Sequence, residues 1–125
     1  AGDFAVCGTR GWNLPQSSVS WTEHDEKIYL RELGRLRMSL EAAKKDGFER
    51  LIAAMHYPPI EQQHRVTGFT ELMREFGVEL VLYGHLHGQG AHFSAFQGMH
   101  EGTEYRLVSC DYLKFRPVLV AKTGE

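Results

Sequence analysis

The stretch LIAAMHYPP, residues 51–59, decides the fold that the sequence predicts. Five apolar residues run without interruption from position 51 to position 55, and a histidine, a tyrosine and two prolines follow them directly. A short unbroken apolar run is typical of a strand that is buried on both faces of a parallel sheet. Because proline cannot continue the hydrogen-bonded ladder of a strand, the strand is expected to end at His56.

The segment before this strand predicts a long helix. Apolar residues recur there at intervals of four and three, which places one apolar stripe along a helix. Thr22, with Asp25 three residues later, is close to a capping-box pattern at its start, and Gly47 is suited to its end. The residues of the stripe are Tyr29, Leu33, Leu36, Leu40 and Ala43.

The segments around these elements complete an alternating pattern. A shorter helix is expected over about residues 68–76, closed by Gly77, and the runs FAVCG (residues 4–8) and VELVLY (residues 78–83) predict two further strands. Strand, helix, strand, helix, strand is the order of a right-handed α/β unit. The later runs AHFSAF, EYRLVSC and RPVLVA predict short strands joined by turns, which we expect to be antiparallel.

Composition narrows the class of protein. The chain has 125 residues, of which 42% are apolar and 24% charged, and its formal net charge is −2. This composition suits one globular domain, residues 1–125, or part of one, and gives no reason to expect a nucleic-acid or membrane partner. No stretch is apolar for long enough to cross a membrane and no signal peptide is visible, so a cytoplasmic location is expected. Cys7 and Cys110 lie in apolar runs, which favours two buried thiols over a disulfide.

Histidines follow two of the predicted strands. His56 comes directly after the run at residues 51–55, and His85 comes after VLYG with His87 two residues further on. In an open α/β sheet the loops beyond the carboxyl ends of the strands form the ligand crevice, so parallel strands would bring these imidazoles to one place. Neutral imidazole is a good ligand for zinc, manganese and iron. The remaining histidines, His24, His64, His92 and His100, are interpreted as surface residues.

The two histidine segments together resemble those of a known family. MHYPP and YGHLHG, in this order and strand context, resemble the histidine motifs of the calcineurin-like metallophosphoesterase superfamily. CGTRGW, EHDEK and YRLVSCDYL are similar to segments of its bacterial predicted phosphohydrolases. The resemblance implies an α/β/β/α sandwich and hydrolysis of a phosphoester at two divalent ions of manganese, iron or zinc. By position, His56 and His85 would bind one ion and His87 the other.

Three other motifs of the family are absent from the sequence. No Asp-x-His, Gly-Asp-x-x-Asp or Gly-Asn-His-Asp occurs, and the only asparagine is Asn13. The chain therefore resembles the C-terminal half of such an enzyme, and no catalytic residue is assigned to it. We expect it to hold at most one metal ion by itself and to be inactive without the missing N-terminal half or a partner chain, since two adjacent cations would repel without a bridging carboxylate.

The loop after the first strand carries a weaker prediction. Arg10 could donate two hydrogen bonds to a phosphate oxygen pair, and Trp12 could form a wall of the pocket. A solvated arginine and a packed tryptophan are an equally good interpretation of GTRGWN. Asp111 is interpreted as a turn or structural residue.

Two alternative functions remain open at the level of sequence. His85-Leu86-His87-Gly88-Gln89 also fits the His-x-His-x-Gln of histidine-triad nucleotidyltransferases, in which His87 would form a covalent nucleotidyl intermediate. That interpretation explains neither HYPP nor the α/β order. A metal chelator would not prevent formation of such a covalent intermediate on His87, whereas it would abolish the activity of a metallophosphoesterase. A complete chain could also be a non-catalytic metal-binding or interaction module.

Overall fold

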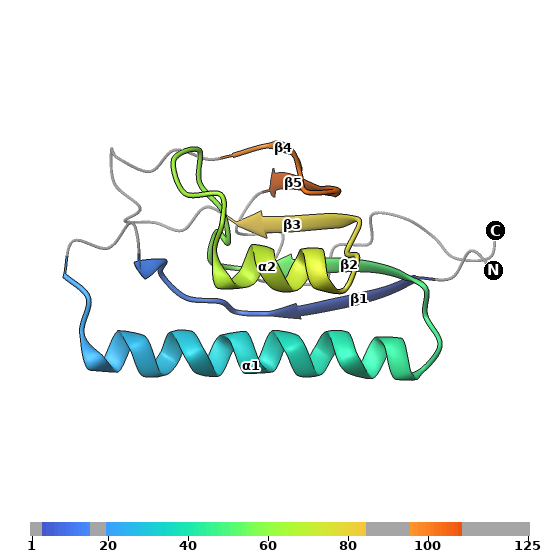
Figure 1. The fold of residues 1–125 in the computed structure, drawn as a ribbon, viewed down its shortest axis with the longest axis horizontal. Coiled ribbons are helices and arrows are strands. Elements are labelled where there is room, and N and C mark those ends of the chain that lie inside the picture. Colours follow the sequence, from blue (N-terminus) through green and yellow to red (C-terminus); the bar gives the residue numbers. More distant parts are fainter. Residues whose placement is uncertain (1–3, 16–19, 85–95, 109–125) are drawn as a thin grey trace.

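The computed structural model of the protein describes residues 4–15, 20–84 and 96–108. Within these ranges the chain forms one five-stranded sheet, ordered β1-β2-β3-β5-β4, and two helices (Figure 1). The elements are β1 (Phe4–Thr9), α1 (Glu23–Lys45), β2 (Arg50–Met55), α2 (Gly68–Glu75), β3 (Leu80–Gly84), β4 (Gly98–His100) and β5 (Thr103–Val108).

The first three strands form the predicted parallel unit. β1 pairs with β2 and β2 with β3, both in parallel, so the α/β order expected from the sequence is confirmed. Cys7, Ala53, Val81 and Tyr105 are aligned across four neighbouring strands and belong to the apolar core. Both crossovers advance in the same direction along the sheet, so right-handed connections put α1 and α2 on the same face. Residues of both helices accordingly share one core cluster with that row.

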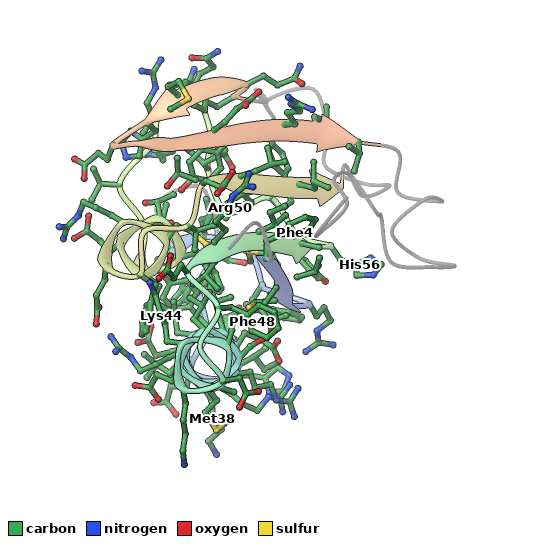
Figure 2. The ribbon with its side chains drawn as sticks, turned by 90° about the vertical axis from the view of Figure 1, so that its right-hand side faces the viewer. Phe4, Met38, Lys44, Phe48, Arg50 and His56 are labelled. Carbon is green, nitrogen blue, oxygen red and sulfur yellow. The ribbon has the colours of Figure 1, made fainter. Side chains whose placement is uncertain are left out.

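Helix α1 begins and ends as the sequence predicts. The Thr22 hydroxyl accepts from the backbone N–H of Asp25, and the Asp25 carboxylate accepts from the backbone N–H of Thr22, which completes the capping box. Past its last turn, Gly47 has φ of 92°, a conformation that glycine adopts without steric cost. Leu36 and Leu40 of the stripe are fully buried, whereas Met38 lies on the opposite side of the helix, away from the sheet (Figure 2).

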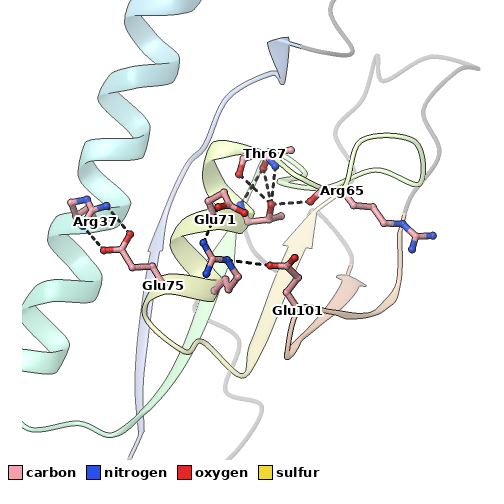
Figure 3. A network of polar contacts seen from close by, with 8 residues as sticks. Arg37, Arg65, Thr67, Glu71, Glu75 and Glu101 are labelled. Carbon is pink, nitrogen blue, oxygen red and sulfur yellow. Dashed lines mark hydrogen bonds and ion pairs between the residues drawn. The ribbon is translucent and has the colours of Figure 1, made fainter.

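Helix α2 is capped by a buried threonine. The Thr67 hydroxyl accepts a hydrogen bond from the Thr70 N–H at 3.1 Å (Figure 3). It also donates to the Pro59 carbonyl at 2.8 Å, so the cap fixes the loop that follows β2. On the surface, Arg37 of α1 donates two hydrogen bonds, of 3.0 and 2.9 Å, to Glu75 of α2 (Figure 3). The two helices are therefore held together by this ion pair as well as by their apolar contacts.

Strand β3 begins two residues later than the predicted run. Val78 is buried, but its N–H donates to the Met73 carbonyl at 2.9 Å and so completes the end of α2. The next N–H, that of Glu79, donates to the Leu51 carbonyl at 3.0 Å, and regular pairing starts with Leu80. The apolar run therefore has two roles, since its first residue terminates a helix before the strand begins.

The later strands are arranged differently from the prediction. β5 is parallel to β3, and only β4 is antiparallel, pairing with β5. Glu101 and Gly102 both have positive φ, of 50° and 86°, as a two-residue hairpin turn requires. This turn reverses the chain, so β5 returns in the direction of β3. The expectation that EYRLVSC would be antiparallel was wrong with respect to β3, Phe96 of the run AHFSAF lies outside any strand, and β4 was not predicted. RPVLVA lies outside the described residues.

The described part of the chain is thus a mixed α/β structure with a mostly parallel sheet. Neither of its helices combines the length and the apolar character needed to cross a bilayer.

Candidate functional site at the carboxyl edge of the sheet

The carboxyl ends of β1, β2 and β3 lie next to one another. Thr9, Met55 and Tyr83 are aligned across the three strands. Arg10 and His56 each follow one of these residues directly, and in the sequence His85 follows Gly84, the last residue of β3. The strands that precede the candidate ligands are therefore parallel neighbours, as expected. His85 and His87 themselves, like Asp111, lie outside the described residues, so the convergence of the three imidazoles stays a prediction.

His56 is partly buried at the end of β2. Its side chain lies just beyond the strand at the edge of the sheet (Figure 2). The following residue, Tyr57, donates its backbone N–H to the Arg10 carbonyl at 3.0 Å, so the two loops are joined where their strands end. Pro58 and Pro59 are buried, which fixes the path of the chain away from the sheet.

Trp12 packs over this junction. Its ring lies 5.3 Å from that of Tyr57, and its indole N–H donates to the Asp25 carboxylate at 3.1 Å. The Arg10 guanidinium lies 5.2 Å from the centre of the Trp12 ring, within the range of a cation–π contact. The packed tryptophan that the sequence left open is therefore present, and Trp12 also orients Arg10.

Glu32 was missed by the sequence interpretation. It is fully buried on α1, and its Oε1 accepts a hydrogen bond from the Thr9 hydroxyl at 2.5 Å. Its Oε2 is approached by three guanidinium groups: nitrogens of Arg35 at 3.1 Å and of Arg10 and Arg31 at 3.5 Å each. The sequence contained one indication that Glu32 would be buried. It lies three residues after Tyr29 and four before Leu36, so helical spacing places it within the apolar stripe.

The environment of Glu32 sets its protonation state. Burial by itself raises the pKa of the carboxyl group, but the Thr9 hydroxyl, the Arg10 and Arg35 charges and the Gly11 backbone outweigh it and lower the pKa below its ordinary value. A carboxyl group with a lowered pKa in the folded state adds stability above its unfolded pKa. That contribution is lost as the pH falls through the folded pKa.

Replacing Glu32 with glutamine should therefore destabilise the protein at neutral pH and much less in acid. We expect a loss of about 1–2 kcal/mol at pH 7, less than for a fully buried ion pair because all three arginines are half exposed. Urea denaturation at pH 7 and pH 3 measures the difference. An equal loss at both pH values would show that the charge of Glu32 does not contribute to stability.

The described residues by themselves do not complete a metal site. Among residues 4–15, 20–84 and 96–108, no three histidine, cysteine or acidic side chains lie close enough together to hold an ion. His56 supplies one imidazole, and a metal needs at least the two further donors proposed at His85 and His87. Of the histidines interpreted as surface residues, His24 is exposed and His64 and His100 are partly buried; His92 lies outside the described residues. Cys7 is a buried free thiol, as expected; Cys110 also lies outside them.

The fold and this edge define a mixed α/β protein whose candidate site lies at the carboxyl ends of parallel strands. Comparisons of the chain with protein-family models, with curated proteins and with solved structures found no match.

Proposed function

We propose that this chain supplies histidine ligands to the metal site of a phosphoester hydrolase that resembles the calcineurin-like metallophosphoesterases. His56, His85 and His87 are the proposed metal ligands, and Arg10 and Trp12 are proposed to border the substrate site. A segment that precedes this chain in a longer protein, or a partner chain, would supply the remaining ligands.

The observation that supports the proposal most is the pairing of β2 with β3. These strands are parallel and adjacent, and Met55 is aligned with Tyr83. In the sequence, His56 comes one residue after Met55, and the His85-Leu86-His87 segment begins two residues after Tyr83. Ligands from the ends of adjacent parallel strands are the arrangement that an open α/β sheet uses for its binding crevice.

The donor set suits the proposed chemistry. Three neutral imidazoles can hold one zinc, manganese or iron ion and leave a position for water or phosphate. A second ion would need carboxylate ligands to offset the repulsion between the two cations, and the family motifs that supply them do not occur in the sequence. When both ions are bound, such a site activates water and stabilises the charge of the phosphoryl group. The chain alone should therefore bind metal but turn over little substrate.

Metal titration of the 125-residue chain tests the proposal. We expect one equivalent of zinc or manganese to bind the unaltered chain, and His85→Ala and His87→Ala each to lose it. His24→Ala is the matched control, since His24 is an exposed histidine on α1 and should leave binding unchanged. Elemental analysis after gel filtration and thermal melts without added metal give the two readouts.

The outcomes separate the competing functions. If His87→Ala kept its metal and melted far lower, His87 would be a structural residue and the proposal would be wrong. Substantial metal-dependent hydrolysis of an aryl phosphate by the pure chain, lost in His85→Ala, would show that the missing ligands are not needed. A chelator-resistant covalent intermediate on His87 would support the nucleotidyltransferase instead.

A further inference from the structure

The arginines beside the candidate site are unevenly paired. Arg10, Arg31 and Arg35 share the single carboxylate of Glu32. Every other described arginine in an ion pair has at least one carboxylate to itself (Figure 3 shows the pair of Arg37 and Glu75). These pairs are Arg37 with Glu75, Arg50 with Glu79, Arg74 with Glu101 and Glu71, and Arg106 with Glu104.

The three arginines converge on one atom. Each has a guanidinium nitrogen within 3.5 Å of Glu32 Oε2, while Oε1 is occupied by the Thr9 hydroxyl. One oxygen cannot satisfy three guanidinium groups with five N–H donors each. Counting only residues 4–15, 20–84 and 96–108, the cluster therefore carries two positive charges beyond the charge of Glu32, and most of its donors remain for another acceptor.

The cluster is both held in place and accessible. Glu32 is fully buried, so it fixes the inner ends of the three side chains, and Trp12 fixes Arg10 further through its ring. The arginine side chains themselves are 46%, 50% and 55% exposed, in the order Arg10, Arg31 and Arg35. A ligand can reach their outer donors without displacing Glu32.

We propose that Arg10, Arg31 and Arg35 bind a dianionic phosphoryl group. Two uncompensated positive charges match the two negative charges of a phosphate monoester, and planar guanidinium groups suit its oxygens. The cluster is linked to the loop that begins at His56, because Trp12 contacts both the Arg10 guanidinium and the ring of Tyr57, the residue after His56. Its role as a subsite rests on the proposed function: the substrate would carry this phosphoryl group in addition to the phosphoester that the histidine site hydrolyses.

Binding of inorganic phosphate to the metal-free chain tests this inference. The arginine Nε–H signals in ¹⁵N NMR report the titration at low ionic strength with a chelator present. We expect saturable shifts of the Arg10, Arg31 and Arg35 signals, and a Kd raised about tenfold in Arg31→Gln and in Arg35→Gln. Arg37→Gln is the matched control, because it also removes an ion-paired arginine from α1, and it should change the Kd less than twofold. Thermal melts confirm that each variant folds.

Three results would each overturn the inference. The first is no saturable binding at up to about 20 mM phosphate, and the second is the same Kd in Arg35→Gln as in the unaltered chain. The third is a tenfold loss of phosphate binding in His56→Ala, which would mean that the arginines and the histidine form one subsite. The phosphate titration contains no metal, so it is independent of the metal titration. If phosphate binds as expected but the metal titration fails, the proposed function is refuted and the phosphoryl subsite is not.

Discussion

His56→Ala should remove metal binding from the chain while leaving its fold nearly intact. Loss of a residue that only orients a metal ligand typically weakens binding 10–100-fold, so loss of one ligand of three should raise the metal Kd by roughly a hundredfold or more. His56 is only partly buried at the end of β2, so its removal should leave no large cavity in the core. Isothermal titration with zinc measures the first effect, and urea denaturation of the metal-free chain measures the second.

A second histidine on the same sheet provides the control for this variant. His100 of β4 is also partly buried, and its ring lies 6.4 Å from that of Tyr105, away from the ends of β1 and β2. His100→Ala should therefore keep the full metal affinity. If His56→Ala bound zinc as tightly as the unaltered chain, His56 would not be a ligand. The parallel pairing of β2 with β3 would then not support a metal site.

Leu36→Ala should be among the most destabilising substitutions in α1. Leu36 is completely buried in the core cluster that joins both helices to the sheet. Truncating a buried leucine removes apolar burial and leaves a cavity, which together cost about 2–5 kcal/mol. Chemical denaturation monitored by circular dichroism gives the change in the free energy of unfolding.

Leu30→Ala in the same helix is the matched control. Leu30 is 56% exposed, and the same chemical change there should alter stability by less than about 0.5 kcal/mol. Both substitutions exchange leucine for alanine within one helix, so helix propensity cancels between them. Equal losses at the two positions would mean that α1 does not pack on the sheet through the face described above.

Local sequence was sufficient for most of the helices and strands. The Thr22–Asp25 capping box, the apolar stripe of α1 and the run at residues 51–55 all correspond to observed elements. These features depend on spacing along a single segment, and helix caps and apolar periodicity are local properties. The parallel order of β1, β2 and β3 was also predictable, because a crossover helix between two strands restricts how they can pair.

Strand pairing and side-chain clustering depended on the tertiary structure. The sequence did not indicate that β5 would lie parallel to β3, because the direction of a strand depends on the hairpin at Glu101 and Gly102 and on the neighbour that the sheet leaves available. From the sequence, only Arg10 was predicted to be a phosphate ligand. Arg31 and Arg35 join Arg10 only because α1 packs along β1 and buries Glu32 against Thr9. Residues more than twenty positions apart come together there through the packing of a helix on a strand, which no local pattern specifies.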